Sequence, residues 1–150
     1  MPERKVVDIM IRDLTALTQD ISLREAARLF SMLHVTGLPV VDEGLHVIGF
    51  LSESDVIDVI SPRSHDHSGI FFIDFSTVLR RMQHATNAVV RDYMTRHPIT
   101  TESSMSVGRV AETMLTEGIK VLPVVRDGVF IGSVNRADVC STLMEDSKEL

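Results

Sequence analysis

The sequence predicts an α/β (α+β) fold in which one small unit, with a short β-sheet and two helices, occurs twice in tandem. Three observations indicate this. The chain aligns with itself at a nearly constant offset, each copy contains a capped helical pattern, and each copy contains two short runs rich in β-branched residues. A chain of 150 residues is long enough to bury a core without disulfide bonds.

The internal repeat defines the organisation of the chain. The stretch VTGLPVV (35–41) pairs with IKVLPVV (119–125) at an offset of 84 residues. The offset then falls to 83, because DEGLHVIG is one residue longer than RDGVFIG, and GFLSESD (49–55) pairs with GSVNRAD (132–138). A one-residue deletion in a glycine-containing turn is typical of a hairpin loop.

Each copy begins with a predicted amphipathic helix. Ser22 precedes the first helix, and Glu25 stands at the position that completes a capping box. Ser106 precedes the equivalent helix in the second copy. Apolar residues recur at helical spacing in both copies, namely Leu23, Ala26, Ala27 and Phe30 in the first and Val107, Val110, Ala111 and Met114 in the second.

Two strands and a second helix complete each copy. The runs LPVV and HVIGFL are separated by DEGL, and the runs LPVV and VFIGSV are separated by RDG, which predicts a strand, a hairpin and a strand. New helices begin at SESDVIDVI (52–60) and NRADVCSTLM (135–144), and an extended lead-in such as HPITT (97–101) precedes the first helix of a copy. We interpret Pro39 and Pro123 as structural residues at strand starts, where no N–H is needed.

Charge and hydropathy exclude several classes of protein. Fifteen basic and twenty-one acidic residues give a formal charge of −6, which argues against the basic footprint of a nucleic-acid-binding protein. Charges interrupt the apolar residues of MPERKVVDIMIRDL, and no stretch is long enough to span a bilayer, so we expect a soluble, cytoplasmic protein without a membrane partner.

Catalytic signatures are missing from the sequence. It contains no G-x-S-x-G, no Walker glycine loop and no H-E-x-x-H, so we expect no enzyme activity and no required cofactor. The single cysteine, Cys140, rules out a disulfide framework and a zinc-type cysteine cluster. We expect Cys140 to be a buried thiol on a helix.

Each copy contains, in the same order, a lead-in, a helix, an LPVV strand, a hairpin and a helix start of the form G-x-x-[S/T/N]-x-x-D. This order resembles a tandem cystathionine-β-synthase (CBS) domain pair, here as a stand-alone CBS domain protein. On this resemblance, residues 1–60 form the first CBS domain (the first repeat) and residues 89–150 the second (the second repeat), with a connecting insert at 61–88. The family implies a pseudo-two-fold pair whose sheets face each other, with clefts that commonly take adenosine-containing ligands. Such domains are regulatory.

The helix starts carry the first candidate ligand residues. Ser52 and Asp55 fit a capping box, which accounts for both without a ligand. A helix N-terminus also suits a phosphate, and a carboxylate can accept two hydrogen bonds from a ribose diol. The family uses such residues in this way, which implicates Ser52 and Asp55, and Asn135, Arg136 and Asp138 in the second repeat. Arg136 and Lys120 would make the second cleft the more favourable one for phosphate, although a solvated face is the alternative for each.

The resemblance also places ligand contacts, mostly through backbone groups that recognise adenine, on the lead-in and at the start of the LPVV strand. The matching residues are Thr15, Ala16, Val35, Thr36 and Gly37 in the first repeat and Ile99, Thr100, Ile119, Lys120 and Val121 in the second. Ordinary strand packing is the alternative for the apolar members.

The leading functional hypothesis is a ligand-sensing regulatory module that binds AMP, ADP, ATP or S-adenosylmethionine and acts on a separate protein. The second is a ligand-free dimerisation or interaction module. We expect a homodimer, because the helix faces with Leu23, Ala26, Phe30, Val107, Ala111 and Met114 look too broad for one small core.

The insert carries a third and weaker hypothesis, a metal site. His65 and His67 flank Asp66, and His84 follows downstream, but no third ligand is fixed by the spacing. The alternative is a polar loop followed by a helix in DFSTVLRRMQHA, capped at Asp74 or Ser76. Five apolar residues of this region would cover a core edge or meet a partner: Phe71, Phe72, Phe75, Val78 and Leu79.

Overall fold

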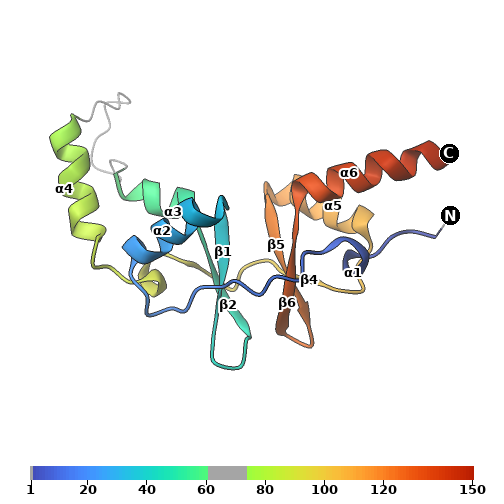
Figure 1. The fold of residues 1–150 in the computed structure, drawn as a ribbon, viewed down its shortest axis with the longest axis horizontal. Coiled ribbons are helices and arrows are strands. Elements are labelled where there is room, and N and C mark those ends of the chain that lie inside the picture. The colour runs from blue at the N-terminus through green and yellow to red at the C-terminus, as the bar shows by residue number, and fades with distance from the viewer. Residues whose placement is uncertain (1, 61–73) are drawn as a thin grey trace. The chain divides into compact units, whose positions relative to one another are not determined.

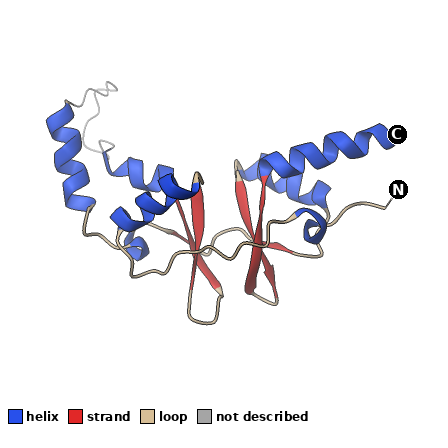
Figure 2. Ribbon diagram, viewed as in Figure 1, coloured by secondary structure: helices blue, strands red, loops and turns tan. Residues whose placement is uncertain are grey.

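The computed structural model describes residues 2–60 and 74–150, and these form two compact units. Unit 1 contains Met1–Thr15, Val41–Ile48 and His97–Leu150, and unit 2 contains Ala16–Val40 and Gly49–Arg96. Each unit is a small sheet with helices, as the chain-order colours of Figure 1 and the secondary-structure colours of Figure 2 show. The mixed α/β composition predicted from the repeats is confirmed.

The sheet of unit 1 has the strand order β4-β5-β6. Strand β4 (Thr101–Glu102) runs parallel to β5 (Val121–Arg126), and β5 pairs antiparallel with β6 (Val129–Asn135). A parallel pair needs a crossover connection, and helix α5 (Val107–Glu117) supplies it. Helix α6 (Arg136–Asp146) follows β6 directly and lies beside α5 on the same side of the sheet (Figure 1). A short 3₁₀ turn, η3 (Ser147–Glu149), ends the chain.

The core of unit 1 lies between this sheet and its helices. It is an apolar cluster whose largest contributions come from α5, the two long strands and the N-terminal segment, with Val6, Met10, Val107, Val110, Met114, Leu122, Val124, Val134 and Val139 as its buried members. At about 25 cal/mol per Å² of apolar surface removed from water, a cluster of this kind supplies the main stabilisation of the unit.

The N-terminal segment completes unit 1 in a way that the sequence did not predict. A short helix α1 (Val6–Ile9) buries Val6, whose N–H donates to the Met105 carbonyl oxygen at 2.8 Å. Ile11 and Ser133 exchange two backbone hydrogen bonds of 2.8 and 2.9 Å, which extends the sheet beyond β6.

Unit 2 also has a three-stranded sheet, with the strand order β1-β2-β3, but its short strand β3 follows the hairpin instead of preceding it. Its strands are β1 (Gly37–Val41), β2 (Val47–Ser52) and β3 (Thr95–Arg96), and β2 pairs antiparallel with β3. The helices are α2 (Leu23–Leu33), α3 (Glu53–Ile57) and α4 (Phe75–Ala85), with 3₁₀ turns η1 (Asp58–Ile60) and η2 (Val90–Asp92). The tip of the β1–β2 hairpin is grouped with unit 1, where the Phe130 N–H donates to the Leu45 carbonyl oxygen at 2.8 Å.

The predicted helix caps form, with one exception. The Ser22 hydroxyl accepts the Glu25 N–H at 3.1 Å, and the Ser106 hydroxyl accepts the Arg109 N–H at 3.2 Å. Asp74, not Ser76, caps α4 by accepting the Thr77 N–H at 2.8 Å. The predicted box at Ser22 is wrong in its second half, because within the described residues the Glu25 carboxylate does not accept the Ser22 N–H.

Other expectations about packing are corrected. Cys140 is exposed, since α6 buries Val139 and Thr142 and turns its thiol outward. The faces expected to dimerise instead pack into the chain's own core: Leu23, Ala26, Phe30, Val107 and Met114 are all buried. That argument for a homodimer was therefore wrong.

Both prolines lie inside strands and not at their starts. Pro123 is the third residue of β5 and faces Ser133, which uses both its N–H and its C=O on Ile11. Strand β4 pairs with β5 only at Val124 and Val125. The missing N–H of Pro123 therefore removes no ladder hydrogen bond.

Candidate functional site

The start of α6 in unit 1 brings together four of the predicted ligand residues. Asn135 is the N-cap, and its side-chain oxygen accepts the Asp138 N–H at 2.8 Å. The Arg136 N–H donates to the Lys120 carbonyl oxygen at 2.8 Å, so the residue before β5 lies beside the first residue of α6. An Asn side chain caps well because its oxygen reaches an N–H that has no partner within the helix.

The start of α3 in unit 2 has the same cap and the same backbone hydrogen bond, but its carboxylate makes a different contact. The Ser52 hydroxyl accepts the Asp55 N–H at 3.2 Å, and the Glu53 N–H donates to the Thr36 carbonyl oxygen at 2.8 Å. In addition, the Ser52 N–H donates to Asp55 Oδ2 at 2.8 Å, which closes a full capping box. The predicted box at Ser52 and Asp55 is confirmed.

The two carboxylates therefore differ. Asp55 holds the N–H of its own cap, whereas the Asp138 carboxylate has no hydrogen-bond or ion-pair partner among the residues that the structure describes. Both side chains are half-buried. A half-buried carboxylate without a protein partner keeps its acceptor sites for solvent or a ligand.

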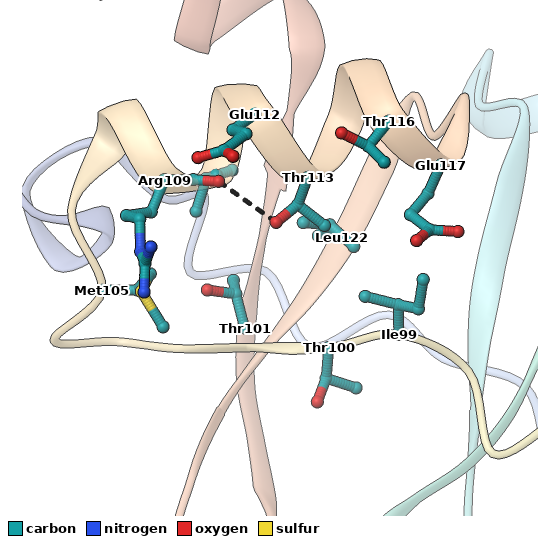
Figure 3. Close-up of a pocket in the computed structure, with 11 residues that line it drawn as sticks. Ile99, Thr100, Thr101, Met105, Arg109, Glu112, Thr113, Thr116, Glu117 and Leu122 are labelled. Atoms are coloured by element: carbon teal, nitrogen blue, oxygen red, sulfur yellow. Dashed lines mark hydrogen bonds between the residues drawn. The ribbon is translucent and has the colours of Figure 1, made fainter.

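A cavity of about 340 Å³ lies in unit 1 between α5 and the lead-in segment (Figure 3). Ile99, Met105, Val110 and Leu122 provide its apolar lining, Arg109, Glu112 and Glu117 its charges, and four threonines its hydroxyl groups. The Thr113 hydroxyl donates to the Arg109 carbonyl oxygen at 3.1 Å, the dashed line in Figure 3. The volume of the cavity falls in the range of small-molecule binding sites.

This cavity shares few residues with the predicted site. Of the ligand residues expected in the second repeat, only Ile99 and Thr100 line it. The sequence analysis missed the polar lining from α5. One signal was available, because these residues recur at i, i+3, i+4, i+7 and i+8 from Arg109 and so share one helix face.

The predicted ligand residues divide between the two units. Unit 1 holds Thr15, Ile99, Thr100, Ile119, Lys120, Val121, Asn135, Arg136 and Asp138, and unit 2 holds Ala16, Val35, Thr36, Gly37, Ser52 and Asp55. Thr15 is already engaged, because its hydroxyl and N–H donate to Asp13 Oδ1 at 2.6 and 2.8 Å. These bonds, the hydroxyl bond foremost, hold the pKa of the Asp13 carboxyl below its ordinary value.

Gly37 is packed against its neighbours at the start of β1. A Cβ at this position would lie 2.7 Å from the Phe50 ring and 2.8 Å from the Leu51 carbonyl oxygen, so this point of the strand has no room for a side chain.

The metal hypothesis finds no support in the described parts of the chain. His65 and His67 lie outside the described residues, and His84 is exposed on α4. Within residues 2–60 and 74–150, no group of three or more His, Cys, Asp or Glu side chains is arranged to hold a metal ion. In the same ranges, no helix has the length and apolar character needed to cross a membrane.

Comparison with known proteins identifies similar chains. The uncharacterized protein MJ1426 of Methanocaldococcus jannaschii is 29% identical over 153 residues, which cover 93% of this chain and 90% of that protein. The chloroplastic CBS domain-containing protein CBSX2 of Arabidopsis thaliana is 29% identical over 137 residues, covering 85% of this chain but only 58% of that protein.

Solved structures and a family model also show similarity to CBS domain proteins. The crystal structure of the CBS-pair protein CBSX2 from Arabidopsis thaliana matches with a TM-score of 0.79 and 25% identity over 98% of this chain and 99% of that one. A crystal structure of CBSX2 in complex with AMP matches with a TM-score of 0.74 and 26% identity, over 95% and 98%. The CBS domain model matches residues 6–62 and 90–145. The resemblance inferred from the repeated residues is thus confirmed, and this chain belongs to the CBS domain family.

Proposed function

We propose that the chain is a regulatory, ligand-sensing module that binds an adenine nucleotide or a related adenosyl ligand and has no catalytic activity of its own. The observation that carries this proposal is the carboxylate of Asp138 at the capped start of α6, which has no partner among the described residues. Two ribose hydroxyl groups can donate to such a carboxylate while Asn135 continues to cap the helix, because the two functions use different atoms.

Similarity to known proteins supports the ligand class. CBSX2, which this chain resembles at 26% identity, has been crystallised in complex with AMP. In the proposal, Asp138 contacts the ribose, Asn135 lies near it, and backbone groups of Ile99, Thr100 and residues 119–121 contact the base. Thr15, Ala16, Val35, Thr36, Gly37, Ser52 and Asp55 are the matching residues of the first repeat.

A ligand-free dimerisation or interaction module is the second candidate. Two observations favour it: Asp55 already has a capping role, and large apolar side chains are exposed on several helices, with Leu115 at 83% and Met32 at 64%. Exposed apolar side chains of this size are typical of surfaces that meet a partner. We propose a homodimer under either candidate function.

Thermal unfolding separates the two candidates. AMP, ADP, ATP and S-adenosylmethionine are each titrated while the unfolding midpoint is followed, with GMP as a matched purine control. A ligand that binds only the folded chain stabilises it by about 2.7 kcal/mol at a hundredfold excess over Kd. We expect at least one adenosyl ligand to raise the midpoint and GMP to leave it unchanged. If none of the four shifts it, the ligand-sensing function is wrong and the interaction module remains.

A further inference from the structure

The two helix starts share a backbone but carry opposite charges. In each repeat, the N–H of the first helical residue donates at 2.8 Å to the carbonyl oxygen of the residue two places before the LPVV run. These paired positions hold Lys120 and Arg136 in the second repeat and Thr36 and Glu53 in the first. With the carboxylates of Asp138 and Asp55 included, one helix start has two cations and one carboxylate, and the other has two carboxylates and no cation.

The basic pair is available to bind a ligand. Both side chains are exposed, and among the residues that the structure describes neither Lys120 nor Arg136 forms a salt bridge or a side-chain hydrogen bond. Some other exposed cations are paired, as Arg91 is with Asp20 at 2.6 Å and Arg4 is with Asp146 at 3.0 Å. These two cations, placed together by a backbone hydrogen bond and without an ion pair in the described parts of the chain, form a local positive patch on a chain of net charge −6.

A phosphate monoester suits this patch. It carries a charge of about −1.5 to −2 at neutral pH and three acceptor oxygens. Arginine and lysine bind such oxygens through charge-assisted hydrogen bonds, which are roughly twice as strong as neutral ones. At the start of α3, Glu53 occupies the position of Arg136, and Ser52 and Asp55 close the capping box, so an anion there would meet two carboxylates.

We propose that Lys120 and Arg136 select phosphorylated adenosyl ligands at the second repeat, and that Glu53 with Asp55 excludes them from the first. The first repeat would accept only adenosyl compounds without a phosphate. This inference rests on the proposed function, because it assigns the charge of the ligand that each repeat takes. Lys120 and Arg136 are then specificity-determining residues.

The test compares AMP with adenosine, which differ only in the phosphate, by calorimetric titration of the full chain. The wild type should bind AMP more tightly than adenosine by about tenfold to hundredfold, the effect of one hydrogen bond to a charged group. Lys120→Thr combined with Arg136→Glu installs the residues of the first repeat. This variant should bind the two ligands with affinities within about threefold of each other. Higher salt should weaken wild-type AMP binding far more than adenosine binding.

A matched control pair changes the same charges elsewhere. Arg126→Glu with Lys148→Thr alters exposed residues at the end of β5 and in η3, and it should keep the wild-type preference for AMP. Thr36→Lys with Glu53→Arg should add a second AMP site per chain. Thermal unfolding verifies that each variant is folded. Retained AMP preference in the Lys120/Arg136 variant, or equal wild-type affinities for the two ligands, would overturn this inference alone. A wild type that binds neither AMP nor adenosine would overturn the proposed function with it.

Discussion

Asp55 and Asp138 occupy matching positions but contact different atoms. Asp55 accepts the Ser52 N–H at 2.8 Å, and Asp138 has no such bond within the described residues. Replacing either residue by Asn keeps its size and removes its charge. Asp138→Asn removes a charge from the first turn of α6 but breaks no hydrogen bond within the described residues, so it should cost only about 0.5 kcal/mol of stability. It should weaken adenosyl-ligand binding by about 1.5–3 kcal/mol, the scale of a hydrogen bond to a charged group.

Asp55→Asn should lower the stability of the chain more than Asp138→Asn does. It weakens a capping bond and removes a negative charge from the first turn of α3, so we expect about 0.5–1.5 kcal/mol of lost stability. Urea unfolding and calorimetric titration of both variants provide the comparison. Unchanged ligand affinity in both would contradict the role of these carboxylates in binding.

Residue-scale features were predictable from the sequence where they are local. The caps at Ser22, Ser52, Ser106 and Asn135 involve an N–H only three residues away, so spacing alone identifies them. The different contacts of Asp55 and Asp138 were not predictable, because Ser and Asn can both cap a helix. The exposure of Cys140 was not predicted, because α6 buries only Val139 and Thr142 of its 11 residues and its apolar pattern is therefore weak.

At the scale of strands, the two repeat-related glycines have different neighbours. A Cβ on Gly132 in β6 would meet the carbonyl oxygen of Ile11, which belongs to a paired backbone segment and has little freedom to move. A Cβ on Gly49 in β2 would meet the sulfur of Met94, which is on a flexible side chain. Gly132→Ala should therefore cost about 1–3 kcal/mol of stability, as overpacking does.

Gly49→Ala is the matched control for this prediction and should cost clearly less, because the Met94 side chain can adopt another rotamer. Urea denaturation of the two variants measures the difference. Equal losses in the two variants would mean that the docking of Ile11 against β6 is not rigid.

The N-terminal segment contains an element, helix α1, that the sequence did not predict. Helices and hairpin strands have local periodic signals, and both copies were predicted at the observed positions. Helix α1 has only four residues, and its position depends on contacts distant in sequence, such as the bridges from Lys5 to Ser106 and from Ile11 to Ser133. Periodicity within one window cannot detect such contacts.

At the scale of the whole molecule, the compact units do not coincide with the repeats. The hairpin tip Val41–Ile48 comes from the first repeat but belongs to unit 1, where His46 pairs with Val129 of the second repeat. The N-terminal segment Met1–Thr15 also belongs to unit 1. The internal repeat shows how many copies the chain contains, but it does not determine which segments pack together, because that depends on long-range backbone pairs.

Self-association remains a prediction for the whole chain, now based on different residues. The faces first expected to dimerise are buried, but Leu115 on α5 and Met144 on the neighbouring α6 are 83% and 66% exposed. Burying apolar surface of this kind in a two-fold interface gains about 25 cal/mol per Å² before the cost of association. We therefore expect a homodimer by light scattering at micromolar concentration.

Charge placed on this surface tests the prediction. Leu115→Glu combined with Met144→Lys leaves the formal charge of the chain unchanged but puts charged groups into the expected interface, where they would lose hydration without a designed partner. The variant should be a monomer with a near-native unfolding midpoint, since both side chains lie outside the core. Phe75→Ser on α4, where Phe75 is equally prominent at 75% exposure, is the control and should remain dimeric. A monomeric wild type would exclude the homodimer. A dimer that survives the double substitution but is lost in Phe75→Ser would instead place the interface on the helix of the insert.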